Sequence, residues 1–518
     1  MTVVERDLPR NPGSDIFVGR EEQIQAFEDA LRMIGSGKSD KAARLFEWHG
    51  VPGIGKSTLI NEITNSCVDR SIPCVEIDIN SASPTTDNYT NNPLLVVDQI
   101  ASSLKHHGID TRSYDEYRSI TSDIPLPDKG VCREYASLTE KARTVTSNSP
   151  AWLQVIDLSL AKFDTVISHM PKNRLPRLVV CIDAGNSTPE LLFDWIEELL
   201  VKRLVQNKHD MVIWTARNPR KWKRPEIRWD RRSEELHPFD EAEVRRYISH
   251  TIPGTNLLSE RLSHDIYMLT GGHPHAVAVV SDELKKTSDM SQDTVREHTS
   301  DLLRAIYERV FEEAIVPQLS IDQRVALEVG SMIRLIDTTT LQNTLPTIRN
   351  GLEKWKRKEY DRLLFDLRKT YLLRWEKSGW ILESSVRHLI RSYHFACNPE
   401  MFTKVNEAGL AVYQRWLSSM VDNRDIFIFE ELYHLASLRQ LTGNDPHIVE
   451  VFSKRLAQYP EDTREHLESW NSTKKRLLRL LVNDGELAGI LRQDERQQLI
   501  HLLKTKGHTS RKTYPVFS

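Results

Sequence analysis

The sequence has few cysteines, no long hydrophobic run and almost no net charge. Its five cysteines are odd in number and form no C-x-x-C pair, which argues against a disulfide framework and a zinc site. No run of about 18 apolar residues is present, and the first residues lack the apolar core of a secretory leader. We therefore expect a cytoplasmic protein that makes no membrane contact.

The charge and length bound what the chain can do. With a net charge of −3, any affinity for nucleic acid must come from a local patch rather than from the field of the whole protein. A length of 518 residues is too great for one ordinary hydrophobic core. The length predicts about three to four domains.

The most informative stretch is a phosphate-loop pattern, G-x-x-x-x-G-K-[ST], at residues 50–57. Residues 43–49 before it predict a short buried strand, and residues 57–68 after it predict an amphipathic helix. Three glycines would let backbone N–H groups turn toward phosphate oxygens at the start of that helix. These glycines are Gly50, Gly53 and Gly55.

The side chains that follow the glycines fit ATP or ADP with Mg²⁺. We predict that Lys56 reaches the β- and γ-phosphates, that the Ser57 hydroxyl binds Mg²⁺ and that Thr58 donates toward the α-phosphate. Residues 178–183 form an apolar run that ends in Asp183, as a buried parallel strand with an acid at its carboxyl edge would. Asp183 is therefore the second predicted Mg²⁺ ligand.

The segment at residues 16–24 has the pattern h-h-G-R-E-x-x-I, about thirty residues before the phosphate loop. It resembles the corresponding segment of STAND NTPases and their AAA+ relatives. This resemblance implies that Val18 and Gly19 frame the adenine and that Arg20 makes a conformational contact.

Two later segments resemble motifs of the same family. Residues 211–217 look like its T-x-R sensor strand, which implies that Arg217 reads the γ-phosphate, although Arg217 could equally belong to the basic loop behind it. Residues 270–277 resemble its G-x-P motif, in which the proline, here Pro274, packs on the adenine. Without the resemblance, the same residues would be a glycine helix cap followed by a proline in the first helical turn.

The chain also departs from the family at two positions. Ala184 stands where motor-type AAA+ enzymes have a Glu that polarises the attacking water, and where STAND proteins often have a second acid. Asn186 and Glu197 are weak substitutes, so we expect an ATPase with slow, switch-type hydrolysis. Glu383 occupies the middle of the segment that matches the Met-His-Asp motif, so the ADP-sensing His is missing.

The predicted fold class is an α/β P-loop core, a parallel sheet with flanking helices, followed by a helical lid, a winged-helix domain and an all-α C-terminal region. The predicted parts are a flexible lead at 1–15, a nucleotide-binding domain at 16–238 with an insertion at about 105–150, a lid at 239–312, a winged helix at 313–398, a helical domain at 399–506 and a basic tail at 507–518.

A loop between two of the predicted strands mixes basic and aromatic residues. Such a mixture can bind nucleic acid, but a solvated loop or a surface for an acidic protein explains it equally well. The aromatic members are Trp222 and Trp229. The basic members are Arg220, Lys221, Lys223, Arg224, Arg228, Arg231 and Arg232.

The resemblance implies an ATP/ADP-dependent switch that binds a signal or partner, opens, forms homo-oligomers and acts in a bacterial signalling or defence system. Because the lead at 1–15 leaves no room for an effector domain, we expect the effector to be a separate chain. The alternative is a DNA-binding AAA+ ATPase of the origin-recognition or transposition-helper type, which would use the winged helix and the basic loop.

Overall fold

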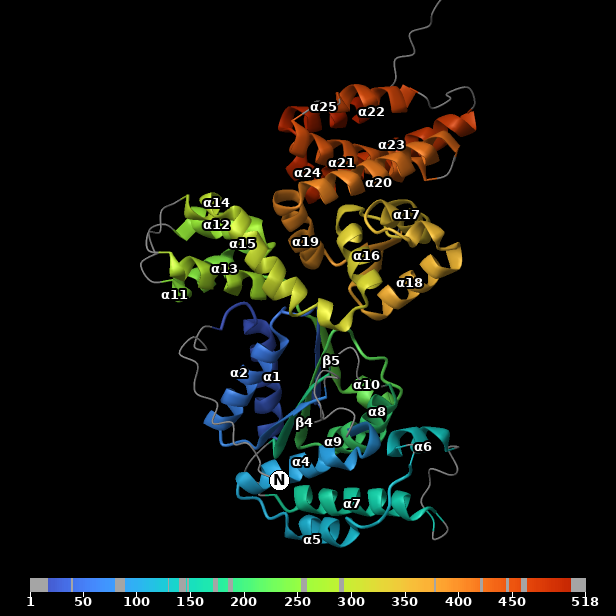
Figure 1. The fold of residues 1–518 in the computed structure, drawn as a ribbon. Coiled ribbons are helices and arrows are strands. Elements are labelled where there is room, and N and C mark those ends of the chain that lie inside the picture. The colour runs from blue at the N-terminus through green and yellow to red at the C-terminus, as the bar shows by residue number, and fades with distance from the viewer. Residues whose placement is uncertain are drawn as a thin grey trace, which may run out of the picture. The chain divides into compact units, whose positions relative to one another are not determined.

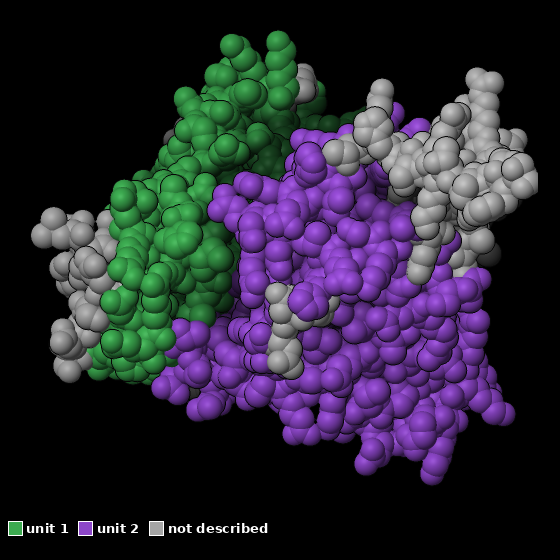
Figure 2. Space-filling view, turned by 90° about the horizontal axis from the view of Figure 1, so that it is seen from above, with its two compact units in different colours: residues 1–298, 313–318 green, residues 299–312, 319–518 purple. Residues whose placement is uncertain are grey.

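A computed structural model describes the chain from residue 17 to residue 504. It divides into two compact units, which are coloured in Figure 2: residues 1–298 with 313–318, and residues 299–312 with 319–518. The predicted lead and basic tail lie outside the described residues. So do the internal segments 39–40, 80–88, 129, 139–145, 147–148, 171–175, 185–189, 253–258, 288–292, 377–378, 420–422, 444–446 and 458–463.

The first unit is built on a five-stranded sheet in the order β2-β3-β4-β1-β5, with every pair parallel. Three central strands are almost wholly buried, as their continuous apolar runs predict. The strands are β1 (Leu45–His49), β2 (Cys74–Asp78), β3 (Leu178–Asp183), β4 (Asp210–Ala216) and β5 (Arg231–Glu235).

Helices cover both faces of this sheet, and Figure 1 shows α1 and α2 on one side and α8 and α10 on the other. The first face carries Phe46, whose ring contacts Phe27 of α1. The opposite face carries the large core cluster that includes Leu45, Val180 and Trp214. The helices are α1 (Glu21–Gly35), α2 (Lys56–Asp69), α4 (Leu94–His106), α5 (Arg112–Thr121), α6 (Val131–Ser137), α7 (Ala151–Ser168), α8 (Glu190–Trp195), a π-helical turn (Ile196–Val201), α9 (Lys202–Gln206) and α10 (Pro225–Trp229).

Four more helices complete the first unit after β5. A capping box at Asp240 starts α11, and Pro274 occupies the first turn of α13, where a missing N–H costs nothing. These helices are α11 (Glu241–Thr251), α12 (Ser259–Thr270), α13 (Pro274–Lys286) and α14 (Thr294–Glu297).

One strand differs from the prediction. The sequence predicts a strand at residues 235–240 that enters the following helix, yet β5 covers Arg231–Glu235, and its first two residues belong to the predicted basic loop. Its polar residues pair with β1, and the strand lies at the edge of the sheet. Since an edge strand is not buried on both faces, it needs no apolar run, and the hydrophobic pattern does not reveal it.

In the second unit, the described residues form helices and one hairpin. Helices α16 to α18 precede the antiparallel pair β6-β7, and Ile336 makes an added bridge to Trp380. The elements are α15 (Thr299–Ile306), a π-helical turn (Tyr307–Glu312), α16 (Ile321–Met332), α17 (Thr338–Thr344), α18 (Arg357–Lys369), β6 (Leu373–Glu376), β7 (Gly379–Leu382), α19 (Ser384–Cys397), α20 (Pro399–Ser419), α21 (Arg424–Thr442), α22 (Ile448–Ala457), α23 (Arg464–Asn483), α24 (Gly485–Ile490) and α25 (Gln493–Lys504).

These units confirm the predicted fold class of an α/β core with a parallel sheet and a helical C-terminal region. The six-part division of the chain stays a prediction, although residues 299–312, assigned to the lid by the sequence, pack with the second unit. Among the described residues, no helix combines the length and hydrophobicity that crossing a bilayer requires.

Candidate nucleotide-binding site

The phosphate loop lies between β1 and α2, as predicted, and its glycines adopt backbone angles that other residues avoid. Gly53 has φ +75°, and Gly55, the residue before α2, has φ +97°. The Lys56 ammonium donates to the carbonyl oxygens of Gly50 and Val51, at 2.8 and 2.9 Å. Burial lowers the pKa of Lys56 to about 8, and Asp183 partly opposes this shift. The loop thus holds a buried cation beside the N-terminus of a 14-residue helix.

The predicted metal ligands meet at the carboxyl end of the sheet. Ser57 Oγ donates to one carboxylate oxygen of Asp183 at 3.0 Å, and Thr215 Oγ1 donates to the other at 2.8 Å. A hydroxyl and a carboxylate are hard oxygen donors that suit Mg²⁺, which usually binds one or two protein groups together with phosphates and water. Among the described residues, no group of three or more His, Cys, Asp or Glu side chains is placed to hold a metal ion. Ser57 and Asp183 therefore fit a nucleotide-bound Mg²⁺.

Arg217 lies directly after β4, next to the same edge. Burial lowers its pKa to about 10, and its positive charge lowers the pKa of Lys56. The two cations are therefore close enough to interact. Both would be neutralised by the negative charge of a nucleoside phosphate.

A cleft of about 770 Å³ opens beside the phosphate loop. It contains the predicted Val18, Arg20 and Pro274 together with Gly53, Gly55, Lys56, Ser57 and Thr58 of the loop. Gly50 and Gly19 do not line it. Sequence reasoning missed the other lining residues, which are Phe17, Ile54, Asn61, Glu62, Asn65, Phe239, Tyr247, Thr251, His275, Ala278, Asp282 and Lys285.

Arg20 and Gly19 contact the phosphate loop and the segment before α11. The Arg20 guanidinium donates to the carbonyl oxygens of Ile54 and His237, at 2.9 and 2.8 Å, and lies over the ring of Phe239. Burial lowers the pKa of Arg20. Gly19 has φ +77°, and a Cβ at this position would meet the Phe239 ring at 2.8 Å. The backbone contacts of Arg20 are those of a residue that holds the loop in place.

The start of α13 is joined to the phosphate loop by two hydrogen bonds, one from its N-cap residue and one from its first turn. His273 is fully buried, and its Nε2 lies 2.9 Å from the carbonyl oxygen of Pro52. The backbone N–H of His275 donates to the carbonyl oxygen of Gly53 at 3.2 Å. A Cβ on Gly53 would meet His273 Cε1 at 2.6 Å. The G-x-P resemblance pointed to Pro274, but the residue that contacts the loop most closely is His273.

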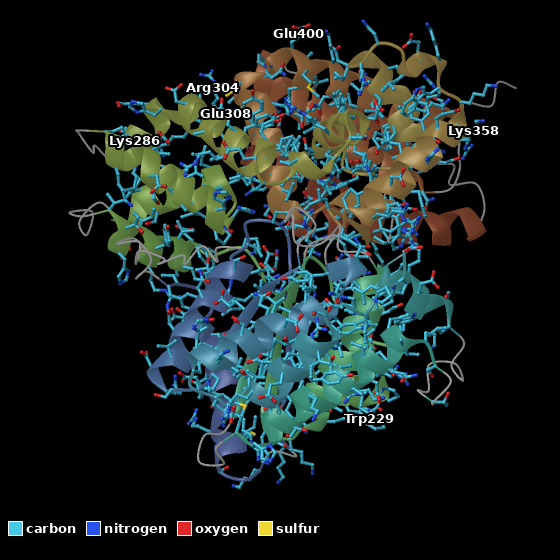
Figure 3. All side chains as sticks on the ribbon, turned by 60° about the horizontal axis from the view of Figure 1, so that its bottom comes forward. Trp229, Lys286, Arg304, Glu308, Lys358 and Glu400 are labelled. Carbon is cyan, nitrogen blue, oxygen red and sulfur yellow. The ribbon has the colours of Figure 1, made fainter. Side chains whose placement is uncertain are left out.

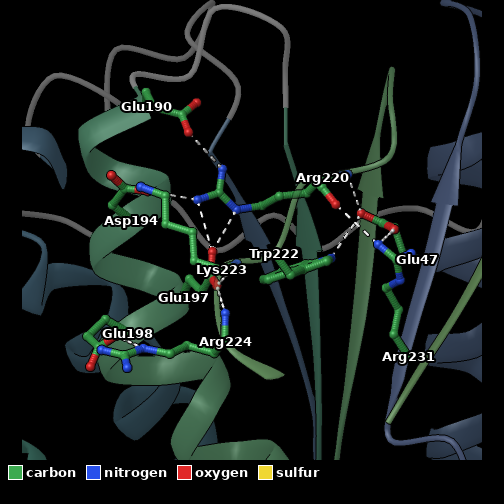
Figure 4. Close-up of polar contacts among 10 residues, drawn as sticks. All are labelled: Glu47, Glu190, Asp194, Glu197, Glu198, Arg220, Trp222, Lys223, Arg224 and Arg231. Carbon is green, nitrogen blue, oxygen red and sulfur yellow. Dashed lines mark hydrogen bonds and ion pairs between the residues drawn. The ribbon is translucent and has the colours of Figure 1, made fainter. Parts of the chain in front are cut away.

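The basic stretch 220–232 is largely paired within the first unit, as Figure 4 shows. Arg220 is only 7% exposed and lies 3.0 Å from Asp194 and 3.2 Å from Glu197. The same stretch supplies further ion pairs: Lys223 with Asp194, Arg224 with Glu198, Arg231 with Glu47 and Arg232 with Glu234. Most of the predicted nucleic-acid contacts are therefore also structural ion pairs.

The two tryptophans of that stretch have different environments. Trp222 is buried, and its indole N–H donates to Glu47 at 3.2 Å. Trp229 is 84% exposed at the end of α10 (Figure 3). Lys221 and Arg228 are exposed and form no ion pair with another described residue. Lys221, Arg228 and Trp229 are therefore the exposed members of the stretch for which no ion pair with a described residue is found.

Glu197, a weak candidate for the hydrolytic base, is occupied elsewhere. It is buried, and it accepts hydrogen bonds from Arg220 and from the backbone N–H groups of Lys223 and Arg224. Asn186 lies outside the described residues. The acid missing at position 184 is thus not replaced by Glu197.

No protein-family model and no curated protein matches this sequence. Among solved structures, the chain is similar to a signal transduction ATPase with numerous domains (STAND) from Pyrococcus horikoshii that has a tetratricopeptide-repeat sensor. The match has 12% identity and a TM-score of 0.29, and it covers 95% of this chain and 65% of that one. The chain therefore spans less than two thirds of that relative.

Two further solved structures match at a similar level. The Thermotoga maritima RuvB Holliday-junction branch-migration motor has 10% identity and a TM-score of 0.32, with 71% of this chain and 93% of that chain covered. Cdc6p from Pyrobaculum aerophilum has 14% identity and a TM-score of 0.32, with 75% and 98% covered. Because these TM-scores are low, the matches do not indicate the roles of individual residues. Those roles are argued from the geometry of this chain.

That geometry defines a class. A parallel sheet has a phosphate loop after β1, an acid at the end of β3 that bonds to the loop serine, and an arginine after β4. The chain has the fold of a P-loop ATPase.

Proposed function

We propose that this protein is an ATP/ADP-dependent molecular switch of the STAND type. ADP holds the closed state, while a signal or partner and ATP favour an open state that oligomerises and acts on a separate effector. The resemblance of the sequence motifs to that family supports this proposal, and so does the absence of an acid at position 184. A switch needs a nucleotide that is held for long rather than turned over quickly.

The observation that carries the proposal is the contact between His273 and the phosphate loop. The carbonyl oxygens of Pro52 and Gly53 accept hydrogen bonds from the start of α13, at its N-cap residue His273 and at His275 in its first turn. A loop that rearranges around a γ-phosphate must move these carbonyls, and the helix bonded to them moves too. A ligand can shift such an equilibrium only through different contacts in the two states, and in the proposed switch these hydrogen bonds are the contacts that differ.

The experiment is to measure the nucleotide retained by the purified protein together with its mass in solution, for wild type and Lys56→Ala. We expect ADP on a monomeric wild type and none on the variant, and ATP with the activating partner should give a larger assembly. An empty site in both proteins with rapid exchange would contradict the switch.

The second candidate, a DNA-binding ATPase, is favoured by one surface of the second unit. The α18 surface consists of Arg357, Lys358, Arg362, Phe365, Arg368, Lys369 and Trp375, all exposed. Phe365 and Trp375 are 53% and 63% exposed, which is unusual for large apolar side chains and suits contact with bases. The helices α16 to α18 with the hairpin β6-β7 form the region predicted as a winged helix.

This candidate has its own test. The triple variant Arg357→Glu, Lys358→Glu, Arg362→Glu should lose salt-dependent DNA binding if the α18 surface binds phosphates. Lys475→Glu with Arg479→Glu, two exposed residues of α23, is the control. The basic loop of the first unit is less suited to charge reversal. Its Arg231 is paired with Glu47, so the change would disturb the fold. Wild-type protein without DNA affinity, or a triple variant that binds as wild type does, would reject this candidate.

A further inference from the structure

Position 184 carries no acid, but the strand next to β3 ends in one. Asp78 is the last residue of β2, and its register partner on β3 is Asp183. The backbone N–H of Ile79 donates to the carbonyl oxygen of Asp183 at 2.9 Å, so the pairing continues to the edge of the sheet. Neighbouring strands lie about 4.8 Å apart, which brings the two acids side by side.

Their side chains share one face of the sheet. Cys74 Sγ lies 3.8 Å from Cys181 Sγ, which places these two side chains on the same face. Side chains alternate along a strand, so Asp78 lies on the face of Cys74, and Asp183 on the face of Cys181. This is also the face of α2, because Ser57 at its start bonds to Asp183.

Glu76, the other acid on this face of β2, lies further from the carboxyl end of the strand. Glu76 accepts a hydrogen bond from Thr64 Oγ1 of α2 at 2.5 Å. Asp78 stands two residues nearer the carboxyl end, about 6.6 Å along the strand, at the level of the phosphate loop. Asp183 therefore has Thr215 of β4 on one side and Asp78 of β2 on the other.

We propose that the Asp78 carboxylate is the catalytic base that orients and polarises the water attacking ATP. It takes the role of the acidic residue that is missing at position 184. This inference rests on the proposed nucleotide site. The water oxygen forms a bond to the γ-phosphorus while a proton of that water passes to the Asp78 carboxylate. The bond from the γ-phosphorus to the bridging oxygen breaks, and its electron pair stays on the departing ADP. The products are ADP and inorganic phosphate, and no further reactant is needed.

The test compares Asp78→Asn, Asp183→Asn and Glu76→Gln with wild type in the full chain. Each protein is assayed for ATP affinity with and without Mg²⁺ and for single-turnover hydrolysis of saturating Mg-ATP. Asp78→Asn should bind Mg-ATP within about threefold of wild type yet hydrolyse it about 100-fold more slowly, the size of a lost general base. Asp183→Asn should lose the gain in affinity that Mg²⁺ gives, and Glu76→Gln should retain both properties.

Two results would overturn the assignment. Hydrolysis by Asp78→Asn at the wild-type rate would show that another group polarises the water, and loss of Mg²⁺-dependent affinity would make Asp78 a metal ligand. A wild type that binds ATP without hydrolysing it also rejects the role of Asp78 while leaving the switch intact. A wild type that binds no ATP, or a Lys56→Ala variant that binds it equally well, rejects the proposed function itself.

Discussion

The imidazole of His273 donates a hydrogen bond from Nε2 to the carbonyl oxygen of Pro52, 2.9 Å away. A carbonyl oxygen can only accept, so Nε2 carries the proton. The Nδ1 atom in turn accepts from the backbone N–H of Ala276 at 3.4 Å, at the start of α13. One neutral ring thus caps a helix with one nitrogen and holds the phosphate loop with the other.

Replacing His273 with Ala should therefore weaken nucleotide retention. The variant leaves the buried Pro52 carbonyl without its donor and the helix without its cap, each a loss of about 1–2 kcal/mol. We expect ADP to dissociate at least tenfold faster, measured with a fluorescent ADP analogue, because the loss of one of these contacts alone, at about 1.4 kcal/mol, corresponds to a factor of ten. His264→Ala, on the exposed side of α12, is the control and should dissociate like wild type. Equal rates in all three proteins would mean that the contact does not hold the nucleotide.

Gly53→Ala should weaken nucleotide binding through crowding as well as through backbone strain. Gly53 and Gly108 have nearly the same φ, +75° and +73°, so an added Cβ costs each about 1–2 kcal/mol. At Gly53 the Cβ would also meet His273 at 2.6 Å, whereas at Gly108 nothing lies within 4 Å. We expect ATP affinity to fall more than tenfold in Gly53→Ala and to stay unchanged in Gly108→Ala, as measured by calorimetry. Similar affinities would contradict the close packing of His273 on the loop.

The sequence predicts which of the candidate site residues lie together where the pattern is local. The phosphate loop fixes Lys56 and Ser57 within one turn, and a buried apolar run ending in an acid fixes Asp183. The structure brings Ser57 and Asp183 to hydrogen-bond distance. The sequence does not single out Asp78, because nothing in the pattern of its strand distinguishes it from other strands. Only the register of β2 against β3 places Asp78 beside Asp183.

The ion pairs of the basic loop could not be predicted from the sequence. Seven cations in thirteen residues suggest a binding patch, but their partners Asp194, Glu197 and Glu198 lie on a segment two elements earlier. Glu47, the partner of Arg231, is fully buried in β1, more than 170 residues away. Charge pairing of this range depends on the topology of the sheet, which composition does not encode.

Arg220→Ala should destabilise the first unit far more than Lys221→Ala. Arg220 is the common partner of Asp194 and Glu197, and its removal leaves the buried Glu197 carboxylate without a counter-charge, at a cost of about 3–5 kcal/mol. The thermal transition of the first unit is the one whose midpoint rises when nucleotide is added. We expect Arg220→Ala to lower that midpoint by a large amount. Lys221 is exposed, so its loss should move that midpoint by less than about 2 °C. Equal midpoints would show that the pairs in Figure 4 contribute little to stability.

The second unit contains a histidine that should make its stability depend on pH. His434 is fully buried, its Nδ1 lies 2.9 Å from the side-chain oxygen of Asn406, and its ring packs on Gly409, where a Cβ would meet it at 2.7 Å. Burial, together with the charges of Arg334, Arg387 and Arg391, lowers the pKa of His434 to about 3. The folded protein therefore keeps this ring neutral under mildly acidic conditions.

Below pH 6.5 the unfolded chain binds a proton at His434 that the folded chain does not, so stability falls as pH falls from about 6.5 toward 3. At pH 5 this group alone should cost about 2 kcal/mol relative to pH 7. His434→Phe keeps the ring but cannot titrate, so it should lose that part of the pH dependence even if it is less stable at pH 7. The measurement is urea unfolding at both pH values, followed in the transition that nucleotide does not shift. His501→Phe, at an exposed position of α25, should keep the wild-type difference. An unchanged difference in His434→Phe would mean that the folded state accommodates the charged ring.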